Sequence, residues 1–201
     1  QLSGSLQEAH RTEIIKFVEK PSLHARHSAL KVMENSPAMS DLHAAVRSLC
    51  DPAAIVRIAA LGVIKHAAGA LSEQHVGDVI KLLQHKVADV KHTALAALAA
   101  FEPSIIAARV VTPVLELLSS PVCDRMMRKL AFDVLMKLER GLHLPASNIS
   151  ALLTHDESSV RKSTLKLLTD KLEPSQLSQY ATLVASCIAH DAPSVQTAAV
   201  A

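Results

Sequence analysis

The residues with the clearest chemical potential are basic side chains that recur at nearly even spacing. Each is followed by a small residue three positions later and a bulky apolar residue at four. The steps between successive members are 31, 34, 37 and 33 residues, and Gln196 takes the equivalent place 35 residues further on. A row of cations can bind a phosphate backbone, so nucleic-acid binding has to be weighed first. The five basic members are Arg26, Arg57, Lys91, Arg128 and Arg161.

Helical periodicity argues against a solvent-facing stripe of these cations. We call each of these basic residues the marker of its segment. On a helical wheel, the apolar residues one position before the marker and three, four and seven positions after it fall on one arc, with the marker at its centre. In one segment these are Val90, Ala94, Leu95 and Leu98. A cation in that place loses water and must be paired or hydrogen-bonded. We therefore predict internal cations held by turn carboxylates and carbonyls, and a net charge of only +2 adds no general attraction to nucleic acid.

The eleven histidines raise the possibility of a metal site. His24 and His27 could share one helical face, but no cysteine or carboxylate joins them at a zinc-like spacing. His85, His155 and His190 recur in turns of separate repeats, too far apart to share one ion. We predict no metal, and a turn or capping role for these three histidines.

Catalysis and cofactor binding find no support in the motifs. The sequence contains no G-x-S-x-G, Walker, dinucleotide or HExxH pattern. Aromatic residues make up only 2% of the chain, which leaves few platforms for stacking a flat ligand or a flipped base. We expect a protein that is not an enzyme and has no cofactor.

The cysteines and the hydropathy indicate a compartment. Cys50, Cys123 and Cys187 are odd in number, widely spaced and set in apolar stretches, so we predict reduced core residues in a cytoplasmic protein. No apolar run is long enough to cross a bilayer, and no membrane partner is expected.

Each marker opens the second helix of a predicted helical pair. The first helices are predicted at 6–18, 39–49, 73–83, 105–118, 146–153 and 176–188, with Pro113 kinking the fourth or marking its true start. The resulting repeats span about 5–35, 38–68, 72–101, 104–140, 145–172 and 174–201. No linker separates them, so we predict a single domain, read as a piece of a longer protein. One pair cannot bury its apolar face alone, whereas stacked pairs can.

The second repeat resembles a HEAT repeat. Asp51 stands six positions before Arg57, Val56 directly precedes the arginine, and Ala59 and Ala60 follow it. The resemblance covers essentially the whole chain and implies an all-α, right-handed α-solenoid of about six HEAT-like hairpins, with the second helices on the concave face. It also implies a non-enzymatic scaffold that binds another protein. The equivalent of Asp51 is another residue type in the other repeats, with Asp156 and Asp191, one position later, as candidate substitutes.

A partner surface is expected on the second helices, one and five residues after each marker. These positions combine a small-residue floor, Gly62, Ala96 and Ala99 beside Ile58, with basic residues to either side. Such a surface fits an amphipathic helix or an extended acidic segment, although an ordinary solvated face would read the same way. The candidate residues are Ile58, His92, Lys129, Lys162 and Lys166.

Three further hypotheses remain open. The family includes tubulin-binding TOG domains, which present intra-repeat turns to acidic tubulin; here His85 and Lys86 make one basic turn, but the first turn lacks the Trp typical of that class. The family also includes DNA glycosylases, for which the aromatic stacking residues are missing. Finally, Val195, Ala199 and Val200 are expected to be incompletely covered at the C-terminal end, so the chain could self-associate there.

Overall fold

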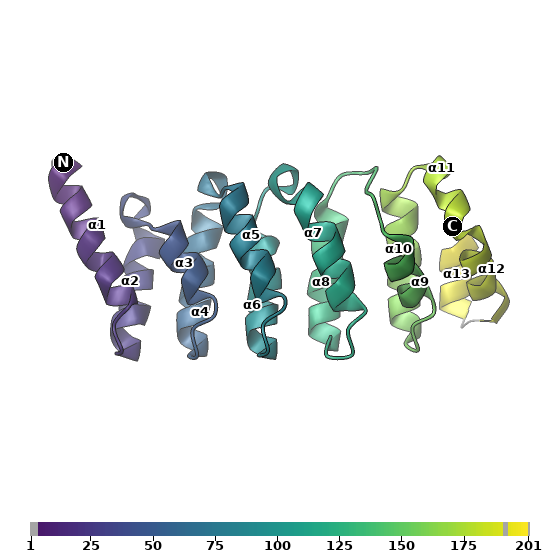
Figure 1. Ribbon diagram of the computed structural model, residues 1–201, viewed down its shortest axis with the longest axis horizontal. Helices are drawn as coiled ribbons and strands as arrows, with labels where there is room; N and C mark the ends of the chain where they lie inside the picture. The colour runs from purple at the N-terminus through teal and green to yellow at the C-terminus, as the bar shows by residue number, and fades with distance from the viewer. Residues whose placement is uncertain (1–3, 191–192, 201) are drawn as a thin grey trace. The chain divides into compact units, whose positions relative to one another are not determined.

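The computed structural model describes residues 4–190 and 193–200, and the regular structure within these ranges is entirely helical. Figure 1 shows the helices following one another as pairs along the chain. The chain divides into two compact units, residues 1–106 and 107–201. The division falls inside helix α7 (Pro103–Leu118). The expected single domain and its repeat limits stay predictions.

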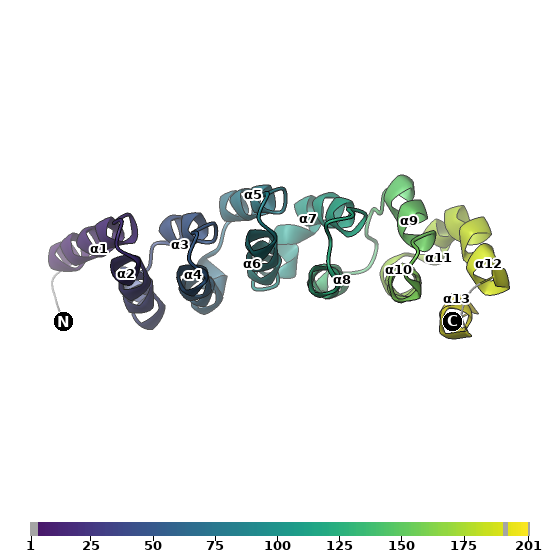
Figure 2. The ribbon, with the colours of Figure 1, turned by 90° about the horizontal axis from the view of Figure 1, so that it is seen from below.

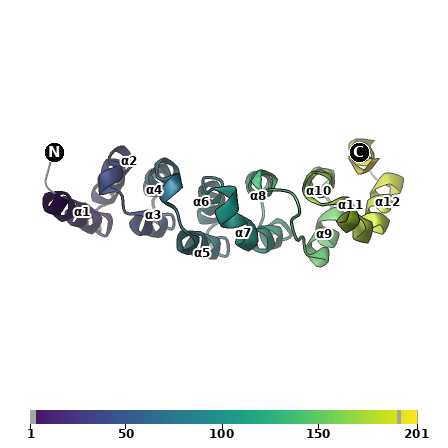
Figure 3. The same cartoon turned by 90° about the horizontal axis from the view of Figure 1, so that it is seen from above.

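The first unit contains three helical pairs. They are α1 (Gly4–Val18) with α2 (Leu23–Asn35), α3 (Leu42–Ser48) with α4 (Ala54–His66), and α5 (Glu73–Leu82) with α6 (Ala88–Leu98). Two short 3₁₀ turns, η1 (Pro37–Met39) and η2 (Ala68–Ala70), link the pairs. Figures 2 and 3 show α1, α3 and α5 in one layer and α2, α4 and α6 in the other. Helix α4 packs between α2 and α6, and α3 packs on α5, so each pair covers its neighbour.

The second unit follows the same scheme. It holds most of α7, then α8 (Arg125–Lys137), α9 (Ala146–Leu153), α10 (Ser158–Lys171), α12 (Ala181–His190) and α13 (Pro193–Val200). Helix α10 packs between α8 and α13, while α12 packs on α9. Two short elements, α11 (Pro174–Leu177) and η3 (Ser178–Tyr180), connect α10 to α12.

The predicted apolar arc forms the core. Val90, Ala94, Leu95 and Leu98 of α6 are all buried. The same positions in α10 are buried too, and there the hydroxyl of Thr164 donates to the Val160 carbonyl at 2.8 Å, so this buried polar group is satisfied. Alanine at the small position lets neighbouring helices approach closely while the leucines fill the space between them. The periodicity argument for the second helices is confirmed.

Several element boundaries differ from the prediction. The helix expected at 39–49 begins at Leu42, because Asp41 caps it by accepting the Ala44 N–H at 2.7 Å. Helix α7 begins at Pro103 and continues through Pro113, so Pro113 does not mark its start. The first helix of the last repeat, expected at 176–188, is instead divided among α11, η3 and α12.

Two burial predictions are wrong in part. Cys123 and Cys187 are buried as expected, whereas Cys50 is exposed at the end of α3, where its thiol donates to the Arg47 carbonyl. At the C-terminal end, Val195 is fully buried rather than incompletely covered, because α13 packs on both α10 and α12. Val200 is 75% exposed. None of the described helices combines the length and hydrophobicity that crossing a bilayer requires.

Candidate functional site

The basic residues at the start of the second helices bind two kinds of acceptor. In Arg26, Nη1 donates to the carbonyls of Lys20 and Pro21, in the turn of its own pair, at 3.2 and 2.7 Å. Its Nε and Nη2 reach the next pair and donate to the two carboxylate oxygens of Asp51 at 2.7 and 3.1 Å. This two-pronged contact is the strong form of an arginine–carboxylate pair, and both side chains are largely buried. Asp51 accordingly raises the pKa of the Arg26 guanidinium.

Asp51 also connects to the following arginine through its backbone. Arg57, which is 6% exposed, donates from Nη1 to the carbonyls of Asp51 and Pro52 at 2.9 and 3.1 Å. Its Nη2 donates to Asp89 of the third pair at 2.9 Å. We call Arg26, Asp51 and Arg57 the Asp51 junction, because one residue binds the arginines of two successive pairs.

The second unit repeats this chemistry with a different acid. Arg128 donates to the Cys123 carbonyl in its own turn and to Glu157 of the next pair, each at 2.6 Å. Arg161 donates to the carbonyls of His155 and Asp156 in its own turn. The prediction fails for Lys91, whose half-buried side chain has no hydrogen-bond or ion-pair partner within the described part of the chain.

The carboxylates that pair with these arginines come from three different positions relative to the basic markers. The sequence predicted only the position of Asp51 and the one after it. Asp51 stands six residues before its own marker, Asp89 two before and Glu157 four before. The expected substitute Asp156 contributes its carbonyl to Arg161, while the neighbouring Glu157 supplies the carboxylate that pairs with Arg128. Asp191 lies outside the described residues. No single position of the repeat therefore holds more than one of these three carboxylates.

The candidate partner surface is divided between the two units. In the first unit, Ile58 of α4 is 68% exposed, and Ile55, in the preceding turn of the same helix, is 48% exposed. His92 of α6 is half-buried. Gly62 does not form an open floor, because the Glu34 carboxylate lies directly over it: a Cβ built there would sit 2.5 Å from a Glu34 oxygen. In the second unit, Lys129 of α8 and Lys162 and Lys166 of α10 are exposed.

The turn histidines make the same local contact in two repeats. The Nδ1 atom of His85 accepts the Val87 N–H at 3.1 Å, and that of His155 accepts the Glu157 N–H at 3.0 Å. This hydrogen bond orders the turn and explains why histidine recurs in register. Lys86, next to His85, is exposed. The side chain of His190 lies outside the described residues.

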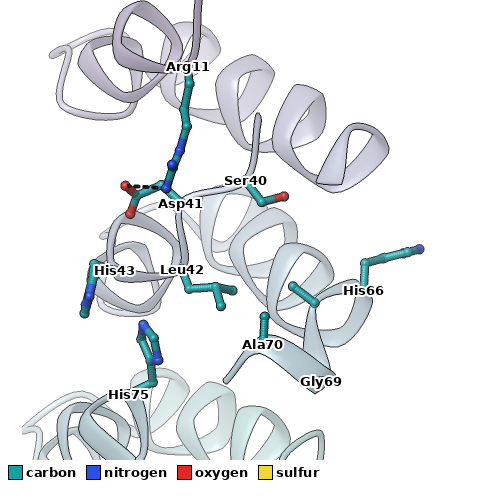
Figure 4. Close-up of a pocket in the computed structure, with 10 residues that line it drawn as sticks. Arg11, Ser40, Asp41, Leu42, His43, His66, Gly69, Ala70 and His75 are labelled. Atoms are coloured by element: carbon teal, nitrogen blue, oxygen red, sulfur yellow. Dashed lines mark ion pairs between the residues drawn. The ribbon is translucent and has the colours of Figure 1, made fainter. Parts of the chain in front are cut away.

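The structure adds a cavity that the sequence analysis missed. It measures about 530 Å³ and lies among α1, α3, α5 and the loops before α3 and α5. Figure 4 shows Arg11 extending from α1 toward Asp41, while His43 of α3 and His75 of α5 point toward one another. The two imidazole rings lie 4.4 Å apart between centroids. Four helices or loops supply these side chains at no regular spacing, so only the folded chain brings them together.

His75 is held in one tautomer. The Ser72 N–H donates to its Nδ1 at 3.1 Å, and the Ser72 hydroxyl lies 2.8 Å from the same nitrogen. Nδ1 is thus an acceptor, and the ring proton sits on Nε2. Burial lowers the pKa of His75, and the neighbouring His43 lowers it further, while Asp78 and Asp41 act in the opposite direction. No group of three or more His, Cys, Asp or Glu side chains in residues 4–190 and 193–200 is placed to hold a metal ion.

The helical pairs with internally paired arginines match solved structures over nearly the whole chain. A designed armadillo repeat protein, YIII(Dq.V1)4CPAF in complex with peptide (KR)4, aligns with a TM-score of 0.59 at 15% identity, over 94% of this chain and 95% of the other. The HEAT-like repeats protein of the archaeon Thermococcus onnurineus NA1 gives 0.57 at 16% identity, over 96% and 85%. An engineered protein, target OR366, gives 0.58 at 17% identity, over 94% and 95%.

The chain has the HEAT and armadillo repeat fold. The predicted all-α solenoid class is confirmed by this likeness. At identities of 15–17%, the likeness of this HEAT/armadillo-like chain to its neighbours shows the fold alone. The sequence matches no family model and no curated protein.

In this HEAT/armadillo-like chain, the contacts of Arg57 and Asp89 predict that mutating the two partners has unequal effects on the free energy of unfolding. Arg57→Met should lower the free energy of unfolding by about 1.5–3 kcal/mol, since it removes charged hydrogen bonds and leaves two turn carbonyls without their donor. Asp89→Asn should cost less than about 1 kcal/mol, because the Asp89 side chain is 68% exposed and the asparagine Oδ1 can still accept a hydrogen bond from Arg57. Urea denaturation of both variants measures the difference. Equal losses, or a larger loss for Asp89→Asn, would contradict the internal role of Arg57.

The environment of His75 predicts a pH dependence. Its pKa is lower in the folded chain than in the unfolded chain, so the unfolded chain binds more protons as the pH falls below about 6.5. The free energy of unfolding should therefore fall with pH in the window below about 6.5. In His75→Gln this dependence should weaken by up to about one proton, since glutamine keeps the capping role at this helix position without titrating.

The matched control for the pH dependence is His66→Gln, because the His66 side chain is 63% exposed. Denaturation series at several pH values compare the slopes of the two variants with that of the unaltered chain. A slope reduced equally in the two variants would remove the special status of His75.

Proposed function

We propose that this chain is a non-enzymatic scaffold that binds an acidic segment of a partner protein along the second helices of its repeats. The observation that carries the proposal is Ile58, a large β-branched side chain left 68% exposed on a helix whose other face is packed on both sides. Ile55 extends the apolar surface by one helical turn. Apolar side chains presented side by side on a rigid helix are suited to anchor a partner segment.

Exposed cations on the second helices of the second unit support an acidic partner. Lys162 and Lys166 lie four residues apart on one side of α10, and Lys129 is exposed on α8. Exposed cations of this kind raise association rates with acidic segments and reject basic ones. One structural neighbour is a designed armadillo protein bound to the basic peptide (KR)4. The exposed lysines of this chain favour an acidic peptide instead.

The tubulin alternative has weaker support. It needs a basic intra-repeat turn, and the turn at His85 offers Lys86 as its one exposed cation, since His85 is half-buried and its Nδ1 accepts the Val87 N–H. The acidic Glu157 of a later turn pairs with Arg128. We therefore prefer the helix surface to the turns as the binding region.

The proposal is tested by selecting displayed random peptides on the immobilised chain and measuring the binding of the winners by fluorescence anisotropy. We expect acidic peptides with an apolar anchor. Ile58→Asp should weaken their binding at least about tenfold, the size of effect typical of an interface anchor. Lys162→Glu with Lys166→Glu should weaken it further through charge repulsion.

Val122→Asp is the matched control for Ile58→Asp. Val122 is 58% exposed in the turn before α8, so the same apolar-to-acid change is made away from the proposed surface. Circular dichroism melts confirm that both variants stay folded. Selected peptides without acidic residues, or equal binding by the two variants, would overturn the proposal.

A further inference from the structure

The side of the first helical pair that faces away from the second pair is apolar and uncovered. Figure 2 shows the α3–α4 pair on one side of the α1–α2 pair and no described helix on the other. On the uncovered side, a groove of about 380 Å³ runs between α1 and α2. Ile14, Phe17, Ala25, Ala29 and Val32 are among the residues that line it, and no formally charged side chain does.

Equivalent positions in later pairs show what this side of a pair contacts. Val32 stands six residues after the marker Arg26 and is 44% exposed. The residues at the same position in α4, α6 and α10 are Val63, Ala97 and Leu167, and all three are 0% exposed. Each of those helices packs on the second helix of the pair before it, whereas α2 has no preceding pair among the described residues. The Val32 side is therefore the side that later pairs bury against their predecessor.

The last pair leaves the opposite side uncovered. Val200 stands four residues after Gln196, which takes the marker position, and is 75% exposed. In α2 and α10, which are each followed by another pair, the same position is held by Leu30 and Leu165, which are 0% and 2% exposed. Leu61, the equivalent residue of α4, is half-buried. The Val200 side is thus the side that a pair turns toward its successor.

The composition of the last pair matches that of an interface. Between Pro174 and Val200 the one formally charged residue is Asp191, although charged residues make up 20% of the whole chain. Interface cores are depleted in charged side chains, and a repeat that faces solvent at the end of a stack carries a polar outer face instead. The first and last pairs therefore expose the two complementary sides that meet between successive pairs inside the chain.

We propose that copies of this chain stack head to tail, with the last pair of one copy covering the α1–α2 side of the next. Val32 and Phe17 of one copy and Val200 of the other become buried, as the equivalent residues are between pairs of a single chain. Such a contact is heterologous, because each copy uses two different surfaces and keeps one of each kind free for a further copy. The proposal does not depend on the partner surface at Ile58.

Sedimentation velocity of the unaltered chain over an about hundredfold range of concentration tests for self-association. We expect the average mass to rise steadily with concentration, because every added copy brings a new free surface. A chain that stays strictly monomeric over this range overturns the proposal. This measurement needs no variant, so it stands whatever the variants do.

Two variants then test the head-to-tail arrangement. Val32→Glu blocks the first-pair surface and Val200→Glu blocks the last-pair surface, and each should weaken self-association at least about tenfold. Mixed in equal amounts, the two variants should form a one-to-one complex and grow no further, since each keeps the surface that the other has lost. Val122→Glu makes the same apolar-to-acid change at an exposed residue before α8 and should associate like the unaltered chain.

The mixture distinguishes this arrangement from a symmetric head-to-head dimer. If α1–α2 surfaces paired with each other, Val200→Glu alone would associate like the unaltered chain and the mixture would form no one-to-one complex; either result overturns the proposal. Equal weakening by Val122→Glu would also overturn it. Circular dichroism melts check that the variants are folded, which is expected because all three substituted side chains are exposed.

Discussion

The structure depends on the fact that a buried guanidinium must have its hydrogen bonds satisfied. Arg57 lies in the middle of an apolar helix face and is almost fully buried, so only fixed acceptors can hold it there. The acceptors are two carbonyls of its own turn and one carboxylate of the next pair. Arg26, Arg57 and Arg128 each fix the shape of the turn before their helix in this way and also attach that pair to its neighbour.

The Asp51 junction concentrates this role in one residue. Its carboxylate binds Arg26 from the preceding pair, its carbonyl binds Arg57, and Oδ1 also accepts the Ala53 N–H at the start of α4. The close-packed apolar core fixes the spacing of the helices. Hydrogen bonds add direction, because they weaken steeply away from linear geometry. Directional hydrogen bonds at the junction set the register in which the first two pairs stack.

The sequence predicted the parts of the fold that depend on local periodicity. The core positions around Lys91 and Arg161 follow from the helical repeat of 3.6 residues, and so does the burial of Arg57. It could not predict which acid completes each arginine, because Asp89 and Glu157 reach their partners across a pair boundary whose geometry no single repeat encodes. The cavity could not be predicted from the sequence for the same reason. Arg11, His43 and His75 come from three helices, and their placement around one cavity depends on how the pairs stack.

Amide hydrogen exchange of Asp51→Asn, read by mass spectrometry, tests the central role of the junction most directly. The account predicts faster exchange in both α2 and α4, the two helices that Asp51 connects through Arg26 and Arg57, with α9 and α10 unchanged. Faster exchange confined to the turn around residues 50–53, with α2 and α4 as protected as before, would contradict it.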